Sequence, residues 1–185
     1  MDFNDTPEEA KFRKEAYDWL KANAPLKEGP KDSWRAASEE EGLKEVKAWQ
    51  KKLHDGGWAC LHWPKQYGGR ESTPIERVIW GQEVSKFKVP GGYLEIGQGM
   101  AGPVMMMYAT EEQKERYLPP LATGEEIWCQ LFSEPAAGSD VAGIKTKSEL
   151  DGDTWTKNGQ KVWTSVAHFS DYGILAVSYT HLTLT

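Results

Sequence analysis

The sequence predicts an α+β protein, with an all-helical region over residues 1–123 followed by an incomplete antiparallel β region over residues 124–177. Helix-start signals and helical apolar spacing recur through the first region. Turn dipeptides and alternating strand patterns occur only in the second. Helices and strands do not alternate along the chain, which argues against a doubly wound parallel sheet.

The first two helices are marked by start and stop signals. Thr6 is typical of an N-cap, Pro7 of the first helical position and Glu9 of a capping box, while Pro25 ends the segment. A second helix covers about residues 43–53 and ends at the glycine pair 56–57. The apolar faces are expected to be Phe12, Ala16, Trp19 and Leu20 in the first helix, and Leu43, Val46, Trp49 and Leu53 in the second.

Three further helices are predicted before residue 123. One begins at Thr73, with Glu76 completing a capping box, and continues to Pro90. A short one covers about residues 103–108, and the last begins at Thr110 and ends at the proline pair 119–120. The third helix is expected to bury Ile75, Val78, Ile79 and Val84.

The β region is predicted from apolar runs and turn signals. Residues 127–132 and 173–177 are short apolar runs, and residues 145–150, 154–157 and 160–163 alternate like half-exposed strands. Asp151-Gly152 and Asn158-Gly159 are turn dipeptides that predict hairpins between the alternating segments.

Charge and composition exclude several classes of function. The 185 residues carry a formal charge of −6, so no basic surface is expected for a nucleic acid. No apolar run approaches the roughly 20 residues of a membrane-spanning helix, and the acidic residues 1–5 do not resemble a secretory signal, so we expect a cytoplasmic protein. Cys60 and Cys129 are expected to be buried thiols, and the four histidines (His54, His62, His168 and His181) lack metal-ligand spacing.

Gly97, Gly99 and Gly102 form a GxGxxG pattern, which in another setting would predict a dinucleotide site. Here the surroundings are helical, and no strand–helix–strand unit contains the pattern. We interpret these glycines as a flexible connector or as a place where helices approach closely.

Two segments carry candidate ligand contacts. Residues 128–140 form a strand that breaks at Glu134-Pro135 into a loop of small residues with hydroxyls, which suits a polar ligand or equally a tight turn. Residues 158–165 end in an aromatic residue and two hydroxyls, which suits a stacked ring or equally core packing of Trp163.

These segments and several others resemble the acyl-CoA dehydrogenase family of flavoenzymes, from the first helix to about Val177. The resemblance is carried by seven motifs, which are Trp63-Pro64-Lys65-Gln66-Tyr67-Gly68-Gly69, Gly102-Pro103, Thr110-Glu111-Glu112-Gln113-Lys114, Tyr117-Leu118-Pro119-Pro120, Ser133-Glu134-Pro135, Gly138-Ser139-Asp140 and Asn158-Gly159-Gln160-Lys161-Val162-Trp163-Thr164-Ser165. The resemblance implies an N-terminal helical domain, a middle β domain and a C-terminal helical domain.

The resemblance also implies an FAD site and an acyl-CoA substrate. The residues expected to contact the flavin are Gln130, Leu131, Phe132, Ser133, Gly138, Ser139, Trp163, Thr164 and Ser165, and Ser139 is also expected to contact the pantetheine of the thioester. Relatives usually have glycine at Ala136 and Gly or Asn-Gly at Val166, where a β-branched residue is expected to strain a turn that needs a positive φ.

The implied reaction converts an acyl-CoA to the 2,3-enoyl-CoA and passes electrons to an electron-transfer flavoprotein. No catalytic base is assigned, because the family takes it from the C-terminal domain and none of Glu83, Glu95, Glu125 or Glu134 matches it. A homo-oligomer, or a heteromer with a related subunit, is implied for the full-length protein.

Two other functions on the same scaffold stay open. One is a flavin monooxygenase or nitroalkane-oxidase-like enzyme, and the other is a non-catalytic partner subunit or acyl-CoA-binding protein. Residues 178–185 carry no charge and no family likeness, so we expect them to be an artefactual tail on a fragment of a longer dehydrogenase. Such a fragment is expected to be inactive, because it lacks the catalytic base, and aggregation-prone, because its sheet has an open edge.

Overall fold

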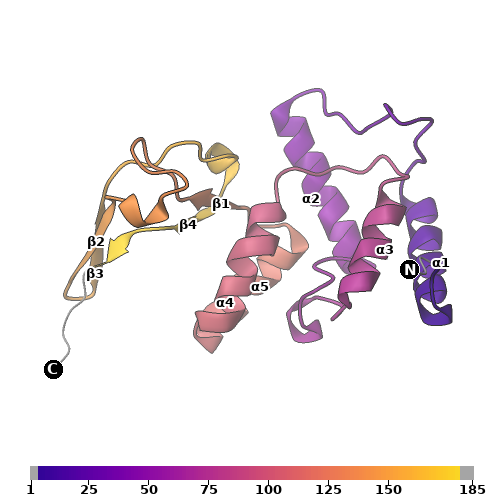
Figure 1. Cartoon of the computed structure of the whole chain (residues 1–185), viewed down its shortest axis with the longest axis horizontal. Coiled ribbons are helices and arrows are strands. Elements are labelled where there is room, and N and C mark those ends of the chain that lie inside the picture. Colours follow the sequence, from indigo (N-terminus) through magenta and orange to yellow (C-terminus); the bar gives the residue numbers. More distant parts are fainter. Residues whose placement is uncertain (1–3, 180–185) are drawn as a thin grey trace.

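The computed structural model describes residues 4–179. Helices occupy one end of the molecule and two small sheets occupy the other (Figure 1). The main helices are α1 (Pro7–Asn23), α2 (Glu39–Asp55), α3 (Pro74–Val84), α4 (Gly102–Tyr108) and α5 (Glu111–Thr123). The strands are β1 (Trp128–Leu131), β2 (Lys147–Asp151), β3 (Thr154–Asn158), β4 (Tyr172–Leu175) and β5 (Ser178–Tyr179). The succession of helices and then strands confirms the predicted α+β class.

The helix starts follow the predicted local chemistry. Thr6, Thr73 and Thr110 each accept a hydrogen bond from the backbone N–H three residues on, and each is capped in return by Glu9, Glu76 or Gln113. These capping boxes satisfy N–H groups that have no partner inside the helix. The starts were therefore predictable from neighbouring residues alone.

The predicted apolar face of α3 is correct for Ile79 but wrong for Ile75 and Val78. Ile75 and Val78 are 47% and 53% exposed, whereas Ile79 and Glu83 are buried. The Glu83 carboxylate is compensated by the Arg13 guanidinium at 2.9 Å and by the Lys86 ammonium at 2.6 Å. Because both carboxylate oxygens are paired, α3 can present this charged residue to the interior. The helix ends at Val84, before the predicted stop at residue 90.

Helix α5 continues through the proline pair at which it was predicted to end. Pro119 and Pro120 lack the N–H groups that would donate to the carbonyls of Glu115 and Arg116, and because these two residues are exposed, water can donate to their carbonyls instead. At the end of the helix, the side-chain amides of Gln98 and Gln50 donate to the carbonyls of Leu121 and Ala122, at 3.1 and 2.7 Å. Long-range contacts thus maintain a helix that local propensity disfavours.

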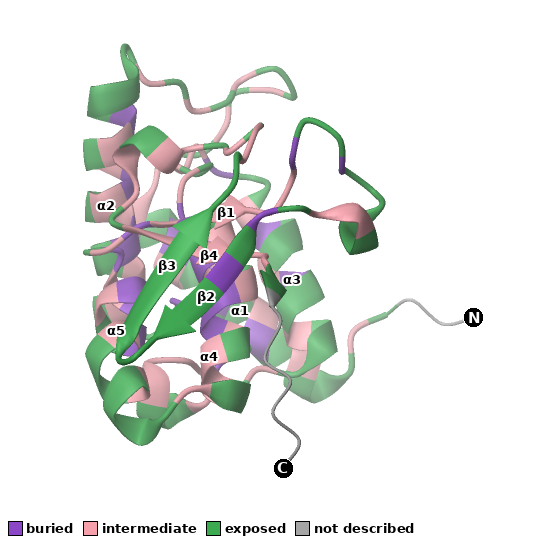
Figure 2. Ribbon diagram, turned by 90° about the vertical axis from the view of Figure 1, so that its left-hand side faces the viewer, coloured by how far each residue is buried: buried purple, intermediate pink, exposed green. Residues whose placement is uncertain are grey.

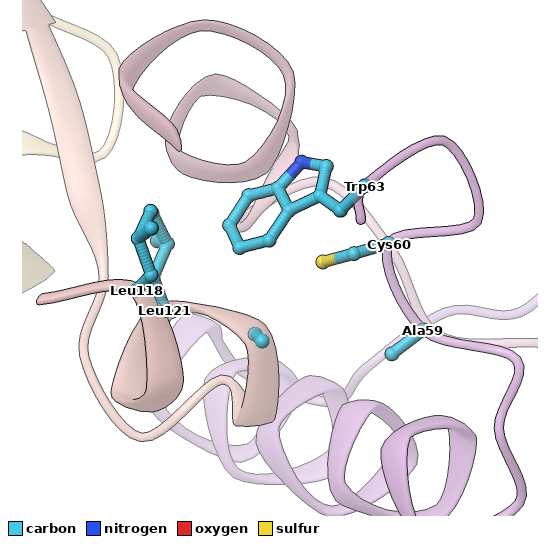
Figure 3. Packing of buried hydrophobic residues seen from close by; sticks show 6 residues of the cluster. Ala59, Cys60, Trp63, Leu118 and Leu121 are labelled. Atoms are coloured by element: carbon cyan, nitrogen blue, oxygen red, sulfur yellow. The ribbon is translucent and has the colours of Figure 1, made fainter. Parts of the chain in front are cut away.

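Trp63 forms the centre of the largest buried cluster. Its ring is fully buried between the loop that carries Cys60 and the residues Leu118 and Leu121 of α5 (Figure 3). Its indole N–H donates to the Gln98 carbonyl at 3.0 Å, which satisfies the polar atom of the ring. The cluster joins α5 to the loop that follows α2.

Two glycines of the GxGxxG pattern allow close packing. Gly97 lies in a π-helical turn, η2 (Gly97–Ala101), and a Cβ there would lie 2.5 Å from Leu121 Cδ1. A Cβ on Gly102 would lie 2.1 Å from Trp63 Cζ2, while one on Gly99 would meet nothing within 4 Å. The pattern therefore reflects helix packing, as the second interpretation above expected.

The strands form two sheets, with a mixture of pairings. Strand β1 pairs in parallel with β4, while β2 pairs antiparallel with β3 and parallel with β5. The prediction of an antiparallel region is thus correct only for the β2–β3 hairpin, which is almost wholly exposed (Figure 2). The long connection between β1 and β4 brings the chain back in the same direction, which permits parallel pairing.

The hairpin predicted at Asn158-Gly159 is wrong. Residues 159–164 form no strand, because the Val162 N–H donates to the Ser133 carbonyl at 2.9 Å instead of pairing with β3. A Cβ on Gly159 would lie 2.3 Å from Thr146 Oγ1, so this glycine allows the chain to cross close to Thr146. The dipeptide Asp151-Gly152 does form the turn of the β2–β3 hairpin.

Both cysteines are buried free thiols, as predicted, and burial raises the pKa of Cys60 to about 12. Of the segment 178–185, Ser178 and Tyr179 form β5, and the rest of that prediction lies outside the described residues, as does His181. Across residues 4–179, no helix is long and apolar enough to cross a membrane.

Candidate functional site

The first candidate segment leaves β1 and turns sharply. Gln130 and Leu131 end the strand, Phe132 and Ser133 follow it, and Glu134 exchanges two backbone hydrogen bonds with Ala137, at 2.8 and 3.1 Å. This turn leaves Pro135 and Ala136 exposed at its tip, followed by exposed Gly138 and Ser139. The backbone around Ser139 is therefore accessible, as a ligand-contacting loop requires.

The second candidate segment is irregular and conformationally strained. Trp163 has a φ of 53° and Val166 a φ of 59°, both in the left-handed region that non-glycine residues rarely adopt. Trp163 is 81% exposed, so the alternative of core packing given above does not apply to it. A large exposed ring on a strained backbone is typical of a surface that binds a ligand.

The structure brings the two segments together through residues 132–133 of the first and residues 161–162 of the second. The Val162 N–H donates to the Ser133 carbonyl at 2.9 Å, and the Lys161 ammonium donates to the Phe132 carbonyl at 2.9 Å. Ser133 and Trp163 therefore belong to adjacent stretches of chain. Within residues 4–179, Gly138 and Ser139 make no hydrogen bond to the second segment.

The hydroxyls predicted as flavin contacts are available for a ligand. In the described part of the chain, the side-chain oxygens of Ser133, Thr164 and Ser165 make no hydrogen bond, and Ser165 is exposed. Trp163 adds an exposed aromatic ring, and the three hydroxyls are donors and acceptors that stand next to it in the chain or in the segment hydrogen-bonded to it. These residues fit an aromatic ring system with polar edge atoms, such as a flavin.

Glu134 connects the turn after β1 to two other stretches of the chain. Its carboxylate accepts from the Lys161 ammonium at 2.8 Å, from the backbone N–H groups of Lys145 and Thr146 at 2.6 and 2.9 Å, and from the Thr146 hydroxyl. The Lys161 hydrogen bond first, and then those from Thr146 and Lys145, lower the pKa of Glu134 from 4.5 to about 2. Neither Lys161 nor Thr146 was predicted as a partner of Glu134, since they lie 27 and 12 residues away in the chain.

The lowered pKa of Glu134 predicts acid sensitivity of this turn. Because the folded pKa lies below the unfolded value, the stabilisation is fully present above pH 4.5 and is lost as the pH falls toward about 2. Urea unfolding at a series of pH values is expected to show a steeper acid loss of stability in the wild type than in Glu134→Gln. Parallel pH curves for the two proteins would contradict this assignment.

Three of the four carboxylates named in the sequence analysis, Glu83, Glu95 and Glu134, are engaged in hydrogen bonds or ion pairs. Glu83 is buried between Arg13 and Lys86, and Glu95 accepts from the Gly92 N–H at 2.8 Å. Glu134 is already fully hydrogen-bonded.

Val166 offers a direct test of the strained turn that the sequence indicated. Val166→Gly is expected to raise the free energy of unfolding by about 1 kcal/mol, because the left-handed conformation costs a non-glycine residue roughly 1–2 kcal/mol and the extra freedom of unfolded glycine cancels only part of that. Chemical denaturation measures the change. Val89→Gly, at a residue without a positive φ, is the control and is expected to destabilise. Destabilisation by both substitutions would remove the claim of strain.

Two surface pockets lie away from these segments, and a third borders the second segment at Asn158 and Gly159. One of about 300 Å³ is enclosed by α2, α3 and residues 89–98, and includes Trp49, Trp80 and Leu94. Another of about 530 Å³ lies between α2 and the end of α5, and one of about 470 Å³ lies against the β2–β3 hairpin. None of the three is lined by a residue predicted to contact the flavin.

Sequence comparison identifies two known domains in the chain. The model of the acyl-CoA dehydrogenase N-terminal domain matches residues 6–125, and that of the acyl-CoA dehydrogenase middle domain matches residues 129–183. The second match extends to residue 183, into the segment 178–185 for which no family likeness was expected.

Two curated relatives are acyl-CoA dehydrogenases named IpdE1. The protein from Mycobacterium tuberculosis is 42% identical over 72% of this chain, and that from Mycolicibacterium smegmatis is 38% identical over 87%. The chain spans only 35% and 44% of their respective lengths.

Solved structures agree with this likeness. The ChsE4–ChsE5 complex from Mycobacterium tuberculosis matches 97% of the chain with a TM-score of 0.71 and 30% identity. A structure titled Tcur3481-Tcur3483 steroid ACAD matches 99% with a TM-score of 0.74 and 27% identity. The chain covers 44% and 46% of these two neighbours.

Proposed function

The chain belongs to the acyl-CoA dehydrogenase family, and on that premise we propose that the whole protein is an FAD-dependent enzyme that oxidises an acyl-CoA thioester to the 2,3-enoyl-CoA. The observation that carries the proposal is the exposed ring of Trp163 in a segment that the Val162–Ser133 hydrogen bond joins to Ser133, with hydroxyls that have no hydrogen-bond partner in both segments. The described residues would supply one part of the active site.

Each predicted contact has a physical role in this proposal. Trp163 would stack on the flavin, and the hydroxyls of Ser133, Thr164 and Ser165 would hydrogen-bond to its polar edge. Gln130, Leu131 and Phe132 would place Ser133, while the exposed Gly138–Ser139 loop would contact the flavin and the pantetheine of the thioester. When bound, FAD supplies the acceptor for the hydride removed from the substrate.

The proton chemistry lies elsewhere in the whole protein. Glu83 and Glu134 are both engaged in ion pairs, so neither is free to take the proton α to the thioester carbonyl. We infer that a carboxylate beyond the described residues acts as the base and that this chain's part is to bind and orient. An electron-transfer flavoprotein would accept the electrons.

The relatives suggest a substrate class and an assembly. One neighbour is described as a steroid ACAD and another is a complex of ChsE4 with ChsE5, and both are more than 25% identical to this chain. These names support testing steroid-derived acyl-CoA thioesters beside straight-chain ones, and testing for a related second subunit. A non-catalytic member of such a pair would bind FAD without being reduced by any acyl-CoA, and a monooxygenase-like relative would consume oxygen.

FAD binding tests the site itself. Titration of the protein with FAD, followed by flavin fluorescence, is expected to show binding that Trp163→Ala weakens about tenfold, because aromatic stacking contributes roughly 1 kcal/mol beyond the area that it buries. Trp155→Ala, which removes an indole from the β2–β3 hairpin instead, is the control. Equal FAD affinity in wild type and Trp163→Ala would remove Trp163 from the site.

A further inference from the structure

Lys161 connects the two candidate segments through its side chain. Its ammonium lies 2.9 Å from the Phe132 carbonyl and 2.8 Å from Glu134 Oε1, so it contacts the residues on both sides of Ser133. The Lys161 and Glu134 side chains are only 9% and 7% exposed. A lysine that is nearly buried must be paired, and here all of its known contacts are with the turn after β1.

The other hydrogen bonds of Glu134 come from a third stretch of chain. The backbone N–H groups of Lys145 and Thr146 and the Thr146 hydroxyl donate to its two oxygens. The ion pair thus connects three stretches of chain: the turn after β1, the start of the β2–β3 hairpin and the irregular segment before η4 (Ala167–Phe169).

Stability alone is a weak reason for such a pair. Removing two charges from water costs about as much as their attraction returns, so a buried ion pair seldom stabilises more than well-packed apolar residues. What charges do provide is a defined geometry, because each hydrogen bond fixes a donor relative to an acceptor. The irregular segment 159–164 has no strand or helix to define its position.

We propose that the Glu134–Lys161 ion pair is a positioning device that fixes Trp163 relative to Ser133, and so presets the spacing between the stacking ring and the hydroxyl beside it. Ser133 directly precedes Glu134, and Trp163 follows Lys161 by two residues, with the Val162–Ser133 hydrogen bond between them. The identity of the ligand rests on the function proposed above, whereas the coupling of the two segments does not.

A neutral double variant tests this role without leaving a buried charge. Glu134→Gln with Lys161→Met keeps similar volumes, so we expect it to fold and to unfold cooperatively. We expect the Val162 amide to exchange with solvent at least tenfold faster than in the wild type, and FAD to bind at least tenfold more weakly. Lys161→Arg with Glu134 unchanged keeps the ion pair, and we expect it to retain much of the protection of the Val162 amide and much of the affinity for FAD.

Arg13→Met provides the matched control, because it removes the cation of another ion pair whose carboxylate, Glu83, is 1% exposed. We expect this variant to lose stability while the exchange of the Val162 amide and the affinity for FAD stay within twofold of the wild type. Equal loss of FAD affinity in the control and the double variant would reduce the pair to a general structural role and overturn the proposal.

The two proposals fail in different ways. If the wild type binds no FAD, the proposed function fails, and the exchange of the Val162 amide still decides whether the pair couples the segments. If the wild type binds FAD and the folded double variant keeps both its affinity and its amide protection, the positioning role is overturned while the proposed function stands.

Discussion

Replacing Trp63 by alanine is expected to lower the free energy of unfolding by about 3–5 kcal/mol, the cost typical of deleting a buried aromatic side chain. Trp63 is fully buried, packs against Leu118 and Leu121, and donates its indole N–H to the Gln98 carbonyl at 3.0 Å. The substitution leaves both a cavity and an acceptor that loses its donor. Denaturant unfolding followed by far-UV circular dichroism measures the change.

Trp163→Ala is the control for this prediction, since the same atoms are removed from a residue that is 81% exposed. Its expected effect on the free energy of unfolding is within about 0.5 kcal/mol, as for most surface substitutions. The two tryptophans thus separate stability from ligand binding. Similar losses of stability in both variants would contradict the placement of Trp63 at the centre of the core.

Gly102→Ala is expected to destabilise by about 1–3 kcal/mol, even though alanine favours helices. A Cβ at this position would lie 2.1 Å from Trp63 Cζ2 and 2.7 Å from Cη2. The ring is held on its other side by α5, so the added methyl must displace the buried indole or the start of α4. Thermal and denaturant unfolding measure the loss.

Gly99→Ala supplies the internal comparison, three residues away in the same pattern. Its Cβ would meet nothing within 4 Å, so helix propensity alone applies and a gain of up to about 1 kcal/mol is expected. Opposite signs for the two substitutions would show that the pattern is a packing feature. A destabilising Gly99→Ala with a neutral Gly102→Ala would instead place the close contact elsewhere.

Much of the helical region was predictable, because its signals are local. The capping residues at Thr6, Thr73 and Thr110 are separated by three residues from their partners, so the sequence alone locates each helix start. The end of α5 was not predictable. Its last carbonyls bind Gln98 and Gln50, which lie 23 and 72 residues earlier in the chain.

In the candidate site, too, local features were predictable from the sequence and contacts between distant residues were not. Ser133 and Trp163 were predicted as ligand contacts from the sequence, because a break in a strand and an aromatic residue followed by hydroxyls are visible locally. The partners that join them were not found, since Lys161 and Thr146 lie 27 and 12 residues from Glu134. The dipeptide Asn158-Gly159 predicted a hairpin, but the Val162 N–H donates to the Ser133 carbonyl and no strand follows the dipeptide.

The most direct test of the proposed function is the response of bound flavin to an acyl-CoA. The full-length product of the gene that encodes this chain, loaded with FAD and kept free of oxygen, would be mixed with a panel of straight-chain and steroid-derived acyl-CoA thioesters while the visible absorption of the flavin is recorded. We predict that at least one thioester bleaches the absorption of oxidised flavin and yields the 2,3-enoyl-CoA. Bound FAD that no thioester reduces would contradict dehydrogenase function and favour a non-catalytic subunit.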